Sequence, residues 1–156
     1  MVRHTYRILL VDDDLSSLEV LGEVLKRAGY EIFSAENGYE ALKIIQGDSI
    51  DLAILDYELP DTTGLELLQQ IKPMQPSVPV IIMSGNMSQN IRLDVFEAGA
   101  YTFIPKPINL RQFQQFVAQA LNFKQRWTSG SETSSHIIQI KKSILQSLFL
   151  HRDFCR

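Results

Sequence analysis

The sequence predicts an α/β protein built on a doubly wound, five-stranded parallel sheet with helices on both faces. Short apolar runs alternate five times with segments in which apolar residues recur at three- and four-residue steps. The first run, Ile8–Val11, shows no polar alternation, which is typical of a strand buried on both faces of a parallel sheet. This alternation of strands and helices favours right-handed crossovers between parallel strands.

The first half of the chain supplies three strand–helix pairs. Asp14 is expected as the N-cap of the first helix and Gly29 as its C-cap. We expect Pro73 to stop the third helix, because proline disrupts a helix interior. The expected elements are a strand over Ile8–Val11, a helix with its stripe at Leu18, Leu21, Leu25 and Ala28, a strand over Glu31–Ala35, a helix over Tyr39–Gln46, a strand over Leu52–Leu55, and a helix over Gly64–Lys72 with Leu65, Leu68 and Ile71 on one face.

The second half supplies the remaining two pairs. Gly99 is expected to end the fourth helix, and Asn109 is expected to cap the fifth. The expected elements are a strand over Val78–Met83, a helix over Ser88–Ala98, a strand over Tyr101–Ile104, and a last helix with its stripe at Leu110, Phe113, Val117 and Leu121.

Polar residues stand at the ends of four of these strands. Asp12 and Asp13 follow the first strand, Asp56 the third, Ser84 the fourth and Lys106 the fifth. The carboxyl ends of parallel strands open onto one edge of the sheet, where doubly wound proteins place their functional groups. We therefore expect a cluster of carboxylates with one hydroxyl and one ammonium group.

This set of groups suits phosphoryl transfer. Crowded carboxylates repel one another, and a hard divalent cation such as Mg²⁺, which prefers oxygen ligands, relieves the repulsion. An aspartate can accept a phosphoryl group to form an aspartyl-phosphate. The transfer depends on neutralising the phosphoryl oxygens, which a cation and a lysine can do, and a hydroxyl can donate a hydrogen bond to them.

Taken singly, the same residues have ordinary structural interpretations. A strand-end aspartate is often a helix N-cap, and a lone serine or lysine is most often merely solvated. Glu58 and Asp61 alone are loop charges, although near the site they would add negative charge. The combination at successive strand ends favours the functional interpretation.

Four sequence blocks carry a resemblance to the receiver domains of bacterial response regulators. The blocks are Ile8 to Asp14 (ILLVDDD), Asp51 to Leu68 (DLAILDYELPDTTGLELL), Val80 to Gly85 (VIIMSG) and Gly99 to Pro107 (GAYTFIPKP). The resemblance covers about residues 5–123, which we expect to form the receiver domain. It implies the flavodoxin-like (βα)5 form of the doubly wound fold.

The resemblance implies a role for each matched position. Asp56 is implied as the phosphoacceptor, and Lys106 as the cation that pairs with it, with a bond to Pro107 that is often cis in the family. The implied protein ligands of Mg²⁺ are Asp12, Asp13, Asp56 and the backbone carbonyl of Glu58, the implied phosphoryl hydrogen bond comes from Ser84, the implied switch residues are Ser84 and Phe103, and the implied turn glycine is Gly64.

The family also implies the partners. The phosphodonor is expected to be a sensor histidine kinase or a histidine phosphotransfer protein. The output is expected through a protein partner that binds the face formed by the fourth helix, fifth strand and fifth helix, with a phosphorylation-linked homodimer as another outcome. We expect a phosphoacceptor signalling protein that catalyses its own phosphorylation and slow autodephosphorylation, rather than an enzyme acting on other substrates.

Bulk composition is consistent with these expectations. The formal net charge of −3 does not favour nucleic-acid binding, which usually requires a basic face. No apolar stretch approaches the roughly 20 residues of a membrane helix, and no signal peptide is evident. The single cysteine, Cys155, cannot form an intramolecular disulfide. We expect a cytoplasmic protein without a transmembrane segment.

The chain continues past the resemblance. Residues 124–135 are expected as a linker that includes the Ser/Thr/Gly-rich stretch RWTSGSETSS, and 136–156 as a C-terminal extension with an amphipathic helix. This helix is expected to pack on the receiver or on a second copy, or to fray, with partner recognition or membrane-surface contact as the alternative. No effector domain is recognisable, which is typical of a single-domain receiver.

Two rival functions remain from the sequence alone. A Mg²⁺-dependent phosphatase of the haloacid-dehalogenase type would use Asp12-x-Asp14 as its opening motif and Ser84 and Lys106 as later motifs. That hypothesis leaves Asp56 unexplained, and Asp153 is the only aspartate that follows the lysine. A module that never accepts phosphate is the second rival, and retention of all five site residues argues against it.

Overall fold

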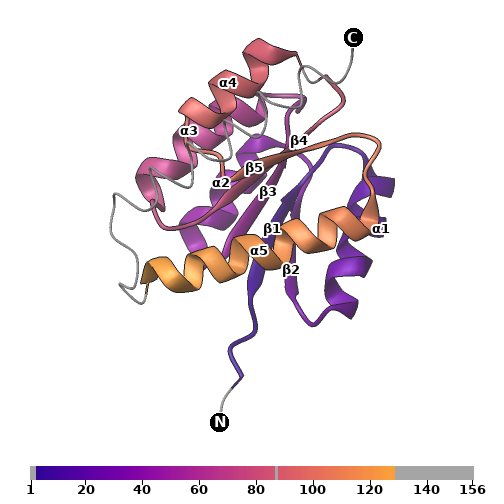
Figure 1. The fold of residues 1–156 in the computed structure, drawn as a ribbon, viewed down its shortest axis with the longest axis vertical. Coiled ribbons are helices and arrows are strands. Elements are labelled where there is room, and N and C mark those ends of the chain that lie inside the picture. Colours follow the sequence, from indigo (N-terminus) through magenta and orange to yellow (C-terminus); the bar gives the residue numbers. More distant parts are fainter. Residues whose placement is uncertain (1–2, 87, 129–156) are drawn as a thin grey trace, which may run out of the picture. The chain divides into compact units, whose positions relative to one another are not determined.

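The fold is a five-stranded parallel sheet with the strand order β2-β1-β3-β4-β5 (Figure 1). A computed structural model describes residues 3–86 and 88–128. This is the doubly wound, flavodoxin-like arrangement that the sequence predicted. The elements are β1 (Arg7–Val11), α1 (Leu15–Arg27), β2 (Glu31–Ala35), α2 (Gly38–Gly47), β3 (Leu52–Asp56), α3 (Gly64–Met74), β4 (Val80–Ser84), α4 (Gln89–Glu97), β5 (Thr102–Pro105) and α5 (Leu110–Thr128).

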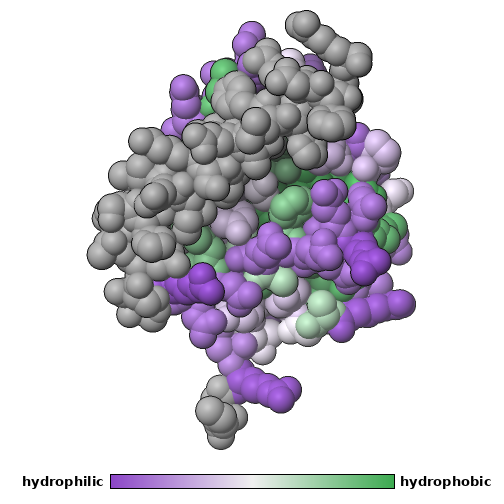
Figure 2. All heavy atoms as spheres, viewed as in Figure 1, coloured by the Kyte–Doolittle hydropathy of each residue, from purple (hydrophilic) through white to green (hydrophobic). Residues whose placement is uncertain are grey.

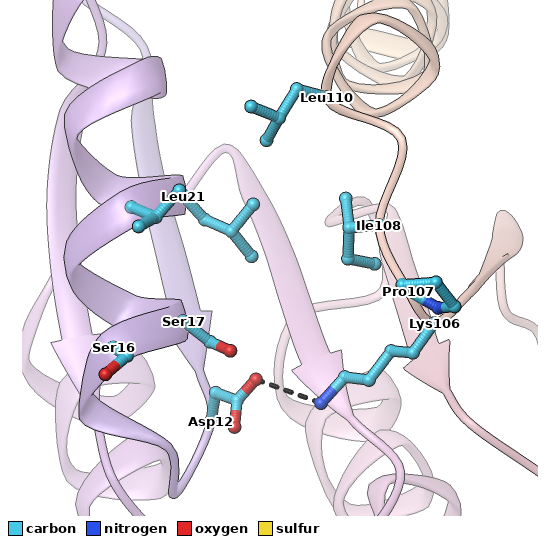
Figure 3. A pocket seen from close by; sticks show the side chains of 9 residues that line it. Asp12, Ser16, Ser17, Leu21, Lys106, Pro107, Ile108 and Leu110 are labelled. Atoms are coloured by element: carbon cyan, nitrogen blue, oxygen red, sulfur yellow. Dashed lines mark hydrogen bonds and ion pairs between the residues drawn. The ribbon is translucent and has the colours of Figure 1, made fainter.

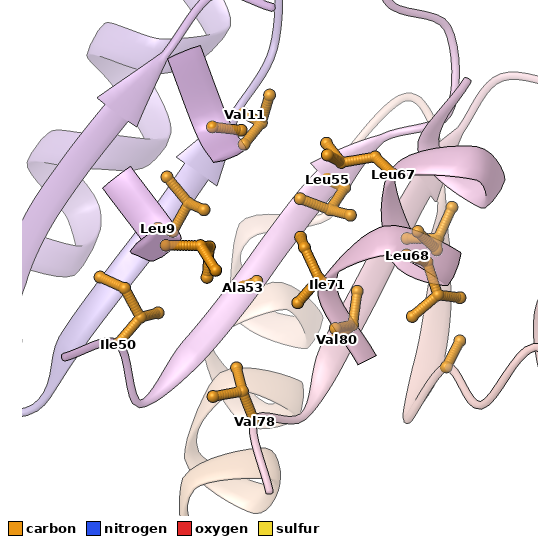
Figure 4. Packing of buried hydrophobic residues seen from close by; sticks show 14 of the residues in the cluster. Leu9, Val11, Ile50, Ala53, Leu55, Leu67, Leu68, Ile71, Val78 and Val80 are labelled. Carbon is orange, nitrogen blue, oxygen red and sulfur yellow. The ribbon is translucent and has the colours of Figure 1, made fainter. Parts of the chain in front are cut away.

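Hydrophobic side chains fill both faces of the sheet. Successive strand residues point to opposite faces, so Leu9 and Ile8 of β1 belong to different core clusters. Helices α2, α3 and α4 contribute to the cluster that contains Leu9, part of which is drawn in Figure 4. Helices α1 and α5 contribute to the other, in which Phe113 is fully buried. The continuous apolar runs therefore reflect burial on both faces.

Helix caps follow the sequence closely. The Asp14 side chain accepts a hydrogen bond from the backbone N–H of Ser16 at 3.0 Å, and Asn109 accepts one from Gln112 at 3.1 Å. Both caps were predicted. Thr63 and Glu66 form a capping box at the start of α3.

Some expected details were wrong. Pro73 lies inside α3, which ends at Met74, because a proline near the helix end removes only one hydrogen bond while Gln75 N–H still donates to the Ile71 carbonyl. Leu67, and not Leu65, is fully buried with Leu68 and Ile71. Ala28 is exposed at the C-cap of α1, outside the buried stripe.

Helix α5 continues to Thr128, so the first residues of the expected 124–135 linker are helical. The rest of that linker and the expected 136–156 extension lie outside the described residues. Among the helices that the structure describes, none is long and apolar enough to cross a membrane.

Candidate functional site

The parallel register brings four strand ends together at one edge of the sheet. Val11 of β1 lies opposite Leu55 of β3, so Asp12 and Asp56 both follow at that edge. Asp56 pairs in register with Met83, the residue before Ser84. Ser84 pairs with Pro105, and Lys106 follows directly. The predicted convergence of strand ends is therefore observed.

Three carboxylates lie close together at this edge. Oxygen atoms of Asp12, Asp13 and Asp56 all lie within 4.8 Å of one another. Asp12 is fully buried and Asp56 is 5% exposed, whereas Asp13 is exposed. One carboxylate oxygen of Asp12 accepts a hydrogen bond from the backbone N–H of Asp14 at 2.9 Å, which fixes its orientation. These carboxylate oxygens are the ligand type that a hard divalent cation prefers.

A single ammonium group serves both buried carboxylates. Nζ of Lys106 lies 3.1 Å from Oδ2 of Asp12 and 3.1 Å from Oδ2 of Asp56. The Lys106–Pro107 peptide bond is cis. Two buried carboxylates thus share one cation, which leaves the cluster short of positive charge.

This shortage of positive charge is reflected in the raised pKa of Asp56. Burial raises its pKa from 3.8 to about 6, the Asp12 charge adds to the rise, and the hydrogen bond and charge of Lys106 oppose it. For Lys106, burial lowers the pKa, but the hydrogen bonds and charges of Asp56 and Asp12 outweigh it and raise the pKa overall. Added positive charge at this site would favour the ionised form of Asp56.

The loop after Asp56 is held tightly against the strand. A Cβ atom on Gly64 would lie 2.6 Å from the Asp56 carbonyl oxygen, and the Gly64 N–H donates to the Tyr57 carbonyl at 2.7 Å. Only glycine fits this approach. Asp61 is directed elsewhere, because its carboxylate accepts hydrogen bonds from the N–H groups of Gly38 and Tyr39 at 2.9 and 3.0 Å. The hydrogen bond from Gly38 is the main cause that lowers the pKa of Asp61.

Residues 8–118 match the family described as the response regulator receiver domain. The chain belongs to this receiver-domain family. Such receivers are signalling modules of two-component systems, and the family membership accounts for the resemblance seen in the sequence. It also removes the basis for the phosphatase hypothesis. Asp14, the second acid of that hypothesis, is bound at the start of α1 by Ser16 and Ser17.

Curated relatives are longer regulators. The chain is 33% identical over 114 residues to the transcriptional regulatory protein ZraR of Klebsiella oxytoca, and 37% identical over 114 residues to the DNA-binding transcriptional regulator NtrC of a Bradyrhizobium strain. Each alignment covers 73% of this chain but 26% and 24% of the relatives. The chain therefore spans about a quarter of their length.

Solved receiver structures match over nearly their whole length. A CheY-like receiver domain from Methanospirillum hungatei superposes with a TM-score of 0.77 and 32% identity, over 79% of this chain and 98% of that one. The receiver domain of a LuxO-type repressor from Vibrio parahaemolyticus gives a TM-score of 0.77 and 29% identity, over 83% of this chain and 100% of that one.

Ser84 lies at the predicted strand end with its hydroxyl engaged by a neighbour. It donates a hydrogen bond to the Asn86 carbonyl at 2.9 Å and accepts one from the Asn86 N–H at 3.1 Å. Asn86 was not among the predicted site residues. The Ser-Gly-Asn run after β4 was the available signal, because these residues favour tight turns with local hydrogen bonds.

The receiver's Phe103 is half-buried on β5 and touches α4. Its ring packs edge-on against Phe96, with centroids 5.4 Å apart, and the guanidinium carbon of Arg92 lies 5.1 Å from its centroid. The position of Phe103 was predicted, but its contact with Arg92 was not.

An apolar groove runs from the carboxylate cluster along α1 (Figure 3). It has a volume of about 420 Å³, and Asp12 and Lys106 lie at its end. Figure 2 shows a face of the molecule on which apolar side chains lie at the surface among hydrophilic ones. Of the residues that line the groove, Val20 and Leu110 are 52% and 41% exposed. The sequence signal that was missed is the position of Val20 outside the α1 stripe. The groove is lined by Asp12, Ser16, Ser17, Val20, Leu21, Lys106, Pro107, Ile108 and Leu110.

Proposed function

We propose that this receiver takes a phosphoryl group from a phosphohistidine onto Asp56, with Mg²⁺ as cofactor. The observation that carries the proposal is the buried Asp56 carboxylate, 3.1 Å from Lys106 Nζ and beside the buried Asp12. The donor is a sensor histidine kinase or a histidine phosphotransfer protein. The site therefore serves signalling rather than turnover of an outside substrate.

The donor set fits Mg²⁺. Carboxylate oxygens of Asp12, Asp13 and Asp56 lie within 4.8 Å of one another, and a small hard cation needs only a few protein oxygens. We assign these three carboxylates and the backbone carbonyl of Glu58 as its ligands. When bound, Mg²⁺ supplies the positive charge that the two buried carboxylates lack.

The residues of the chain divide the transfer between them. An oxygen of the ionised Asp56 attacks phosphorus, the P–N bond to the donor imidazole breaks, and that imidazole leaves with the bonding electron pair and takes up a proton. Lys106 pairs with a phosphoryl oxygen. The Ser84 hydroxyl breaks its hydrogen bond to the Asn86 carbonyl and donates to a second phosphoryl oxygen, because it can rotate to this stronger acceptor. Later attack by water on the phosphorus restores Asp56 and releases inorganic phosphate.

The groove beside the site suits the donor. It is lined mostly by apolar side chains and ends at Asp12 and Lys106, so a helix seated in it would bring its histidine to Asp56. We place the donor there, against Leu110 and Val20.

The output uses another face. Movement of Ser84 lets the Phe103 ring turn inward, which changes the surface of α4, β5 and α5 and so the binding of a protein partner or a second copy. We propose no direct nucleic-acid contact for residues 5–123, the receiver domain. We also propose that 136–156, which lies outside the described residues, is a C-terminal extension of the receiver domain.

The test is labelling with a small phosphodonor. The full chain is incubated with phosphoramidate and Mg²⁺ and resolved on a phosphate-affinity gel. We expect a shifted band that disappears in Asp56→Asn, in Asp12→Asn and without Mg²⁺. Asp51→Asn is the matched control. Asp51 is also a buried carboxylate paired with a lysine, Lys124, but it lies before β3 and not at the carboxyl end of a strand.

Two outcomes would contradict the proposal. Labelling that survives in Asp56→Asn but disappears in Asp12→Asn would indicate a different aspartate nucleophile. Absence of labelling both by phosphoramidate and by a phosphorylated histidine kinase would leave an interaction module.

A further inference from the structure

The Phe103 ring is contacted from α4 by two side chains, Arg92 and Phe96. These residues are four positions apart and so lie on one face of the helix. The guanidinium carbon of Arg92 is 5.1 Å from the ring centroid, within the range of a cation–π contact, and Phe96 packs edge-on at 5.4 Å. The orientation of the ring and the position of α4 are therefore coupled.

Among the described residues, no hydrogen bond or ion pair of the Arg92 side chain explains its position. Its Nε atom is buried and has no hydrogen-bond partner, and Arg92 forms no ion pair in the part of the chain that the structure describes. An unpaired buried N–H is unfavourable, so the stack on Phe103 must offset it. The contact thus depends on the ring remaining where it is.

We propose that Arg92 is a latch that holds Phe103 in the unphosphorylated orientation. The Arg92 latch is the contact of the Arg92 guanidinium with the Phe103 ring. Inward movement of the ring breaks this contact, so the latch opposes the activated conformation and lowers the affinity of the site for a phosphoryl group or its mimic. This inference rests on the proposed function of Asp56 and adds a positioning residue on α4.

The experiment measures binding of beryllofluoride, a mimic of the aspartyl-phosphate, to the full chain with Mg²⁺. Arg92→Ala is expected to bind it about fivefold more tightly than wild type, which corresponds to about 1 kcal/mol. Arg111→Ala is the matched control, because it removes an exposed arginine from the first turn of α5. The control should bind with wild-type or weaker affinity, since a lost positive charge does not favour an anion.

A second readout separates a latch from a structural role. Without beryllofluoride, the aromatic NMR resonances of Phe103 in Arg92→Ala should move toward their positions in the beryllofluoride-bound wild type. Loss of stability alone would not tighten binding.

Affinity in Arg92→Ala that is unchanged or weaker than wild type would overturn the latch while leaving the proposed function intact. Wild-type protein that binds no beryllofluoride, or an Asp56→Asn variant that binds it equally well, would overturn the proposed function and the latch with it.

Discussion

Replacement of Asp56 by asparagine is expected to stabilise the metal-free protein near neutral pH. The folded state raises the pKa of Asp56 from 3.8 to about 6, mainly because the carboxyl is buried. At about 1.4 kcal/mol per pKa unit, the ionised carboxylate costs about 3 kcal/mol of stability above that pH. Asparagine removes this cost but forms a weaker hydrogen bond with Lys106, so we expect a net gain of about 2 kcal/mol.

The sign of the effect depends on pH. The folded protein keeps a proton on Asp56 between about pH 4 and pH 6, where the unfolded chain has lost it, so the contribution of Asp56 to stability falls as the pH rises through this window. The advantage of Asp56→Asn should therefore be present at about pH 7.5 and absent at about pH 4.

Thermal and urea unfolding in EDTA measure this difference. For a domain of this size, about 2 kcal/mol corresponds to a rise in Tm of about 8 °C at neutral pH. Added Mg²⁺ should reduce this difference in Tm, because it stabilises wild type more than the variant, which lacks one carboxylate ligand of the metal. An Asp56→Asn variant that is less stable than wild type at neutral pH, or whose advantage is the same at both pH values, would refute the reasoning.

Three further predictions concern other parts of the domain. Asp51→Asn should lower the free energy of unfolding by about 2 kcal/mol at neutral pH, and by less in acid. Burial raises the pKa of Asp51, but Lys124, Arg7 and His4 outweigh burial and lower it, so the ionised carboxylate stabilises the fold. Urea unfolding at neutral and acidic pH measures the difference. Gly64→Ala should lower the free energy of unfolding by at least about 2 kcal/mol and slow labelling of Asp56, because the added Cβ would lie 2.6 Å from the Asp56 carbonyl oxygen. Urea unfolding measures the stability and the phosphate-affinity gel measures the labelling. Wild-type values in both assays would contradict the steric argument. Leu110→Asp should slow transfer from a histidine kinase about tenfold while leaving labelling by phosphoramidate unchanged; equal rates from the kinase would exclude the groove as the donor site.

Much of the fold follows from patterns that act locally. The apolar runs predict the strands because a parallel sheet buries both faces of each strand, as it does for Ile8 and Leu9. Asp14 and Asn109 predict helix starts because their side chains satisfy backbone N–H groups. The site was predictable for the same reason, since parallel strands must end at one edge and the residues there are polar.

The features that escaped prediction depend on contacts between distant segments. Arg92 and Phe103 meet only because α4 packs beside β5, and the spacing of the two residues in the sequence carries no sign of this. The ion pair of Asp51 with Lys124, at 2.7 Å, joins the start of β3 to α5 in the same way. Pro73 was misjudged because its cost depends on how few helix hydrogen bonds remain after it.

The most direct test of the central claim identifies the phosphorylated residue chemically. The chain is phosphorylated with phosphoramidate and Mg²⁺, reduced with borohydride, which converts an aspartyl-phosphate to homoserine, and mapped by peptide mass spectrometry. We predict homoserine at position 56 and unmodified aspartate at positions 12 and 13. Homoserine at Asp12 or Asp13 with Asp56 unchanged, or phosphate retained on a histidine, would contradict the assignment of Asp56 as the acceptor.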